Sequence, residues 1–60
     1  MNSKENSKIK ILIIEDDHDI RDLIRLQLRL QNYNVSVACN GSEAMSKIEN
    51  EIYDLILIDR

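Results

Sequence analysis

The stretch Ile11-Leu12-Ile13-Ile14-Glu15-Asp16-Asp17 organises the interpretation of the whole chain. Four consecutive large aliphatic residues are typical of a β-strand that is covered on both faces. The three acids follow at the point where such a strand emerges into solvent. A near copy, Leu55-Ile56-Leu57-Ile58-Asp59, stands at the other end of the sequence. Because both apolar runs end in acid, we expect a cluster of carboxylates at one edge of a sheet.

Between these two runs, the spacing of apolar residues alternates between strand and helix. It predicts strands over residues 9–14, 33–38 and 53–59 and helices over residues 17–31 and 42–51. Strands that alternate with helices predict an α/β fold, with a β-α-β-α-β parallel sheet and right-handed crossovers. Residues 1–8 are a polar lead-in that we expect to be disordered.

Particular residues indicate where the elements end and which side faces inward. The first helix is expected to end near Asn32, a residue that tolerates the left-handed conformation of a helix C-cap. The second helix is expected to start at an N-cap formed by Asn40 or Ser42. Its inward face is predicted to contain Ala44, Met45 and Ile48. The strand over residues 33–38 alternates apolar with polar residues, which is typical of an edge strand.

Composition is that of a small soluble domain. The 60 residues are 43% hydrophobic and 32% charged, which is too apolar for disorder and leaves room for one small core. No apolar run approaches the roughly 20 residues that span a bilayer, so no membrane association is expected. The net charge of −3 argues against nucleic-acid binding, because phosphate contacts need clustered cations. The single cysteine, Cys39, excludes an internal disulfide and indicates a cytoplasmic location.

The carboxylates define the candidate site. If strands 9–14 and 53–59 are neighbours, their carboxyl ends bring Glu15, Asp16 and Asp59 side by side, at the edge where open α/β sheets bind ligands. Three carboxylates in contact repel one another, so either one of them holds a proton or a cation occupies the site. An all-oxygen set of ligands suits Mg²⁺.

Four motifs then occur in order along the chain. They are the stretch 11–17, Ile20-Arg21-Asp22-Leu23-Ile24, Asn40-Gly41-Ser42-Glu43-Ala44 and Tyr53-Asp54-Leu55-Ile56-Leu57-Ile58-Asp59. Each motif is weak alone, but the four at this spacing resemble the first half of a response regulator receiver domain from two-component signalling. The resemblance covers about residues 8–60. It implies that residues 9–60 form a partial receiver domain, the first half of a flavodoxin-like fold.

The resemblance also implies a role for each acid. Asp59 matches the aspartate that accepts a phosphoryl group from the phosphohistidine of a sensor histidine kinase. Asp16 matches the carboxylate that binds Mg²⁺ directly, and Glu15 matches its acidic neighbour, which acts through water. A divalent ion would offset the repulsion between the attacking carboxylate and the phosphoryl oxygens. Asp17 matches a variable position of the family.

Other parts of the family pattern are missing. Receiver domains bind the metal through a backbone carbonyl two residues after the acceptor. In this sequence only one residue, Arg60, follows Asp59. Their switch Ser or Thr after the fourth strand and their Lys after the fifth strand are also absent. We therefore expect the chain to be an incomplete fragment of a receiver domain.

Several polar residues are expected to have structural roles only. Asp17 and Asp19 are expected to cap the helix that follows them. His18 is interpreted as a solvated residue rather than a phosphodonor or metal ligand. Cys39 is interpreted as an inert, packed thiol. A solvated helix face is predicted to contain the row Arg21, Arg25 and Arg29.

Three functions from different classes remain open. The first is a phospho-accepting signalling module, which is not itself an enzyme. The second is an inactive half-domain that associates with itself through the strand 53–59, because an unpaired apolar edge invites pairing with another chain. The third, ranked last, is a Mg²⁺-dependent phosphohydrolase with Asp59 as the nucleophile.

Overall fold

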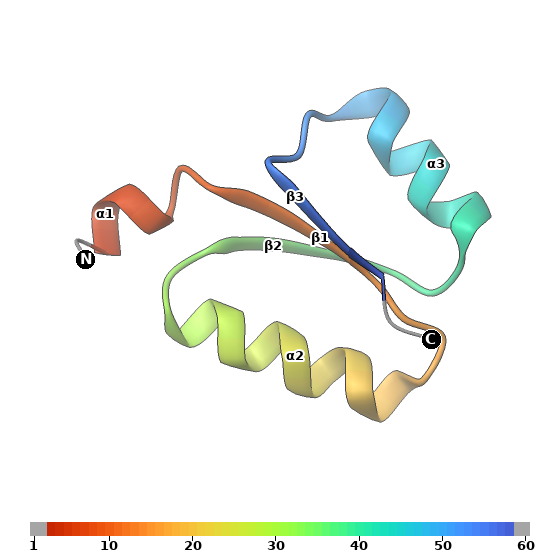
Figure 1. Cartoon of the computed structure of the whole chain (residues 1–60), viewed down its shortest axis with the longest axis horizontal. Helices are drawn as coiled ribbons and strands as arrows, with labels where there is room; N and C mark the ends of the chain where they lie inside the picture. The colour runs from red at the N-terminus through yellow and green to blue at the C-terminus, as the bar shows by residue number, and fades with distance from the viewer. Residues whose placement is uncertain (1–2, 59–60) are drawn as a thin grey trace.

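The computed structural model describes residues 3–58 and has the α/β architecture that the sequence predicts. Its elements, in order, are α1 (Ser3–Asn6), β1 (Lys10–Ile14), α2 (His18–Leu30), β2 (Asn34–Ala38), α3 (Gly41–Asn50) and β3 (Leu55–Ile58). The strands form one parallel sheet in the order β2-β1-β3. Helices α2 and α3 lie on opposite sides of this sheet (Figure 1). Within the described residues, no helix is long and apolar enough to cross a membrane.

Strand β1 is the centre of the sheet and supplies most of the core. Ile11, Leu12 and Ile13 are buried, and the latter two have no exposed surface. Leu12 packs with Ala38 of β2 and Ala44 of α3 in one apolar cluster. A strand with neighbours on both edges and helices on both faces leaves no side for water, which is why four successive aliphatic residues are accommodated there.

The two outer strands are held in register with β1. Ile11 is opposite both Val35 of β2 and Leu55 of β3, and Ile14 is opposite both Ala38 and Ile58. In the described sheet β2 lies at one edge, so the edge position predicted for the strand over residues 33–38 is confirmed.

The start of β3 is tied to β1 by a reciprocal pair of hydrogen bonds. The Lys10 amide donates to Asp54 Oδ2 at 2.8 Å, and the Asp54 amide donates to the Lys10 carbonyl, also at 2.8 Å. This pair sets the point at which the chain enters β3.

Local capping explains where α2 and α3 begin and end. Asp17 and Asn40 are the N-caps of the two helices. At the end of α2, Asn32 has a φ of 67°, in the left-handed region. The Asn32 amide donates to the Arg29 carbonyl at 2.9 Å and the Tyr33 amide donates to the Leu28 carbonyl at 3.2 Å. These are the two bonds of a Schellman motif, so the predicted C-cap is confirmed.

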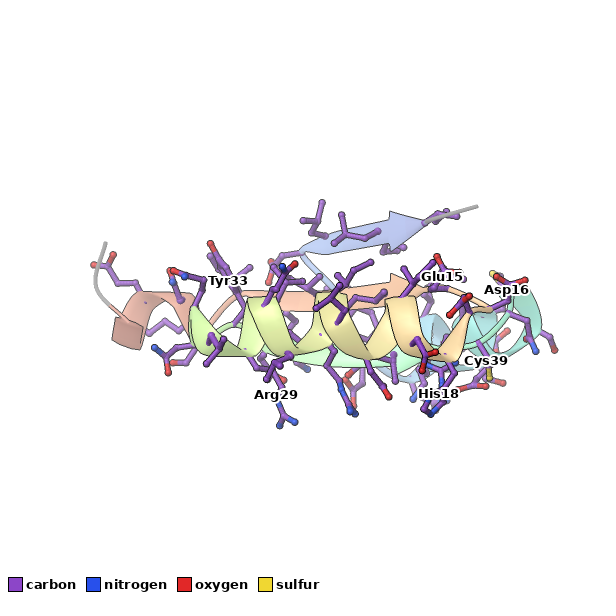
Figure 2. All side chains as sticks on the ribbon, turned by 90° about the horizontal axis from the view of Figure 1, so that it is seen from below. Glu15, Asp16, His18, Arg29, Tyr33 and Cys39 are labelled. Carbon is purple, nitrogen blue, oxygen red and sulfur yellow. The ribbon has the colours of Figure 1, made fainter. Side chains whose placement is uncertain are left out.

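The inward face predicted for the second helix is only partly correct. Ala44 is buried, but Met45 is 57% exposed and Ile48 is 38% exposed. A similar exposure is seen on α2, which has no buried residue. The physical reason is the narrow sheet, because α2 and α3 both pack mainly on β2 and β1. Figure 2 shows that β3 stands clear of α2.

The polar lead-in also differs from the expectation of disorder. Residues Ser3–Asn6 form one helical turn, α1. The Asn6 side chain is buried, and its Nδ2 donates to the Gln31 carbonyl at 2.6 Å. This bond attaches the turn to the end of α2 and supplies a partner for a carbonyl that the helix itself leaves unbonded.

The left-handed backbone at Asn32 generates a testable prediction. Asn32→Ala should lower the free energy of unfolding by about 1 kcal/mol. A Cβ atom disfavours the left-handed conformation, and alanine lacks the side-chain amide that lets asparagine adopt it. Asn32→Gly should leave stability unchanged or raise it. Urea unfolding followed by circular dichroism measures both variants. Equal destabilisation by the two substitutions would contradict a backbone origin and point to the amide side chain instead.

Candidate functional site

Glu15 is the first acid after β1, and the structure buries it. Glu15 is only 3% exposed. Its amide donates to the Ala38 carbonyl at 3.1 Å, which extends the pairing of β1 with β2 by one residue. Its Oε1 accepts a hydrogen bond from the Asp17 amide at 2.9 Å. The expectation that all three acids emerge into solvent is therefore wrong for Glu15, since a hydrogen-bond donor is available to its carboxylate inside the fold.

Asp17 performs the capping role that the sequence predicts. Its Oδ1 accepts from the Asp19 amide at 2.9 Å and from the Ile20 amide at 3.1 Å. Two of the amides that a helix start leaves unbonded are thereby satisfied. Asp19 is an exposed residue of the first turn and not the cap.

Asp16 lies between Glu15 and Asp17 in the sequence and is exposed. Its carboxylate makes no hydrogen bond or ion pair with any residue in the range 3–58. Glu15 and Asp16 both lie at the end of the molecule where β1 stops and α2 begins (Figure 2). The three consecutive acids thus differ in environment: Glu15 is buried and hydrogen-bonded, Asp16 is exposed, and Asp17 caps a helix.

Asp59, the predicted phospho-acceptor, lies outside the described residues. The residue before it, Ile58, is the last residue of β3, which pairs with β1 in parallel and places Ile58 opposite Ile14. In sequence, Glu15 and Asp59 each follow one of these two paired residues. Within residues 3–58, no group of three or more His, Cys, Asp or Glu side chains is placed to hold a metal ion. The predicted meeting of the three carboxylates remains a prediction.

Arg21 departs from the solvated row predicted for the arginines of α2. It is half-buried, and its Nη1 donates to the Glu15 carbonyl at 3.4 Å. Arg25 pairs with Asp22 at 3.3 Å on the surface, and Arg29 is exposed. Arg21 is the member of the row one turn after the cap, so its side chain reaches back to the end of β1.

His18 is confirmed as a solvated residue. Its side chain is 73% exposed, and its Nε2 lies 3.5 Å from Asp22 Oδ2 one turn along the same helix. Such a contact between exposed side chains contributes little to stability.

Cys39 is exposed, so its interpretation as a packed thiol is wrong. Its Sγ donates to Glu43 Oε2 at 2.7 Å. This hydrogen bond raises the pKa of the Cys39 thiol and lowers the pKa of the Glu43 carboxyl. The spacing Asn40-x-x-Glu43 resembles a capping box, in which the glutamate side chain bonds the backbone amide of the N-cap residue. The Glu43 carboxylate accepts from Cys39 Sγ instead, so this spacing did not predict the contact. Asn40 Oδ1 indeed accepts from the Glu43 amide at 2.8 Å.

The family model described as "Response regulator receiver domain" matches residues 11–60. The transcriptional regulatory protein ResD of Bacillus subtilis is 42% identical over 55 residues, covering 92% of this chain and 23% of that protein. The transcriptional regulatory protein KdpE of Staphylococcus aureus is 50% identical over 50 residues, covering 83% of this chain and 22% of that protein.

A third relative is also a transcriptional regulator by name. The probable transcriptional regulator ycf27 of Cyanidium caldarium is 36% identical over 58 residues, covering 97% of this chain and 23% of that protein. The chain therefore spans less than a quarter of the length of these three relatives. No solved structure matches.

The contact between Cys39 and Glu43 generates a prediction about thiol reactivity. Glu43→Ala should lower the pKa of Cys39, because it removes both the acceptor that holds the thiol proton and a charge that repels the thiolate. The rate of reaction with an aromatic disulfide, measured against pH, should then rise at a lower pH than in the unmodified chain. Glu49→Ala, on the same helix, is the matched control. An unchanged pH dependence in Glu43→Ala would contradict the assignment.

Proposed function

We propose a function for this chain on the premise that it belongs to the response regulator receiver domains of two-component systems. In this proposal Asp59 accepts a phosphoryl group from the phosphohistidine of a sensor histidine kinase. The observation that carries it is the parallel pairing of β1 with β3, in which Ile14 is opposite Ile58 and an acid follows each residue. Receiver domains are signalling modules, so in this proposal the phosphorylated form of the chain carries the signal.

The proposed metal site consists of Glu15, Asp16 and Asp59, with Mg²⁺ as the ion. Asp16 fits such an ion, because it offers an exposed carboxylate with no partner in residues 3–58. Glu15 is buried and its Oε1 accepts from the Asp17 amide, so we propose that it acts on the ion through water and not as a direct ligand. Oxygen ligands from one or two carboxylates, completed by water, are the usual environment of Mg²⁺ in proteins. When bound, the ion neutralises negative charge that develops on the phosphoryl oxygens.

The chain itself supplies the nucleophile. One Asp59 carboxylate oxygen attacks the phosphorus atom, an O–P bond forms, and the N–P bond to the donor histidine breaks. The histidine nitrogen keeps the bonding electron pair, and because the other ring nitrogen of the donor carries a proton, the leaving group is a neutral imidazole. An aspartate can act in this way without an activating base because its carboxylate is ionised near neutral pH.

The setting of this reaction follows from the relatives. ResD and KdpE are transcriptional regulatory proteins by name. We infer that this chain takes part in a comparable pathway in the cytoplasm, where a sensor histidine kinase is its phosphodonor. Direct contact with nucleic acid is not proposed for this segment, in keeping with its net charge of −3.

A second candidate function, self-association, is favoured by the exposure of β3. Leu55 is 47% exposed, Ile56 is 39% exposed and Ile58 is 69% exposed, although all three are strand residues. One edge of β3 pairs with β1, and within the described residues no strand pairs with the other edge. Edge strands of stable monomers are usually short, charged or covered, and Leu55–Ile58 contains no charge. Antiparallel pairing of β3 with the β3 of a second copy would cover this edge in a closed dimer.

The phosphoacceptor proposal is tested by incubating the chain with a small phosphodonor and Mg²⁺ and measuring its mass. A single phosphoryl adduct is expected, and Asp59→Asn should abolish it. Asp16→Asn should slow labelling by about 100-fold, the scale for removing one group that stabilises developing charge. Asp19→Asn is the matched control, because Asp19 is an exposed acid of α2 that is not part of the proposed site.

Two outcomes would contradict the proposal that Asp59 is the phosphoacceptor. Labelling that survives in Asp59→Asn would exclude this residue as the acceptor. Continuous release of inorganic phosphate without an adduct would favour the phosphohydrolase alternative.

Self-association is tested by light scattering after size exclusion. We expect a mass of twice the 7.0 kDa monomer at micromolar concentration. Ile56→Lys should return the chain to the monomer, because a buried, unpaired ammonium at the new interface is strongly unfavourable. Ile52→Lys is the control, since Ile52 is 86% exposed and lies outside β3. A monomeric, folded unmodified chain would rule the dimer out.

A further inference from the structure

We propose that Asp17 is a positioning residue for the metal ligand Asp16, acting through its hydrogen bonds and not through its charge. The inference rests on the proposed function, because it assigns a role within the same Mg²⁺ site. Family resemblance leaves Asp17 without a role, and the structure shows only that it caps α2.

The turn that contains Asp16 is bonded at both of its ends. On the strand side, the Glu15 amide donates to the Ala38 carbonyl at 3.1 Å. On the helix side, Asp17 Oδ1 accepts from the Asp19 and Ile20 amides. The Arg21 amide donates to the Asp17 carbonyl at 2.9 Å, which is the first bond of the helix. The residues on each side of Asp16 are therefore hydrogen-bonded to a regular element, Glu15 to β2 and Asp17 to α2.

A further bond bridges Asp16 itself. The Asp17 amide donates to Glu15 Oε1 at 2.9 Å, so the two neighbours of Asp16 are joined directly. The Arg21 guanidinium adds a contact from α2 to the Glu15 carbonyl at 3.4 Å. These bonds restrict the backbone of Asp16 while leaving its exposed carboxylate without a partner in residues 3–58.

Such an arrangement preorganises the Asp16 backbone for metal binding. A group held in its bound conformation before binding loses less conformational freedom when the ligand arrives, which raises affinity. Asp17 is the member of the turn that connects Asp16 to α2 through its side chain. If the cap is lost, the first turn of α2 frays and the direction of the Asp16 carboxylate is no longer set.

The chain offers substitutions that separate capping from charge. Asparagine caps helices about as well as aspartate, so Asp17→Asn keeps the hydrogen bonds and removes the charge. Asp17→Ala removes both. Asn40→Ala removes the corresponding cap of α3, where Asn40 Oδ1 accepts from the Glu43 amide at 2.8 Å, and leaves the turn after β1 unchanged. It is the matched control for a general loss of stability.

The experiment measures Mg²⁺ affinity by calorimetric titration of the unmodified 60-residue chain and its three variants, under conditions where circular dichroism shows each of them folded. Asp17→Ala should raise the Kd by about tenfold or more, the range for groups that orient a metal ligand. Asp17→Asn should stay within about twofold of the unmodified chain, because its capping is retained. Asn40→Ala should also bind as the unmodified chain does. Without metal, amide exchange at Asp17 and Ile20 should accelerate in Asp17→Ala alone.

Each contrary result has a distinct meaning. Equal losses in Asp17→Asn and Asp17→Ala would show that charge is responsible, and equal losses in Asn40→Ala and Asp17→Ala would show a general stability effect. Either result overturns the positioning role. Unchanged affinity in Asp17→Ala, with tight binding by the unmodified chain, overturns this inference but leaves the proposed function standing. An unmodified chain that binds no Mg²⁺ overturns both.

Discussion

The burial of β1 on both faces is the constraint on which the rest of the structure depends. Leu12 and Ile13 point to opposite faces of the sheet and have no exposed surface. Burying one such side chain contributes about 1.5–3 kcal/mol, which is large for a domain of this size. The helices on the two faces and the strands on the two edges are the elements that keep water from these residues. Every other feature of the fold is arranged around this strand.

The site follows from that constraint because β1 ends at a defined place. Because β1 is packed on both faces and paired on both edges, its carboxyl end has a defined position, and Glu15, Asp16 and Asp17 follow directly from it. Their different environments then separate their roles: Glu15 is buried and bonded, Asp17 caps α2, and Asp16 is exposed. Among the three acids, Asp16 is thus the one whose carboxylate has no partner within residues 3–58, which is the chemistry expected of a direct metal ligand.

The same constraint limits the fold. The described sheet has β1 at its centre and β3 at one edge, so β3 gains a partner on one edge only. Its residues keep the apolar character of a central strand, as does the exposed side of α2, and both remain accessible to solvent. This conflict between an apolar sequence and an exposed position is the physical basis of the self-association considered for the chain.

Local patterns in the sequence determined the order and type of the elements after α1, the edge position of β2 and the caps at Asp17, Asn32 and Asn40. These features depend on neighbouring residues, so periodicity and turn chemistry are sufficient to predict them. The tertiary structure alone decided the burial of Glu15, the exposure of Met45 and the pairing of Cys39 with Glu43. Each of these depends on which atoms lie across the fold or one helical turn away. The opening acids are consequently a single motif in sequence and three different environments in space.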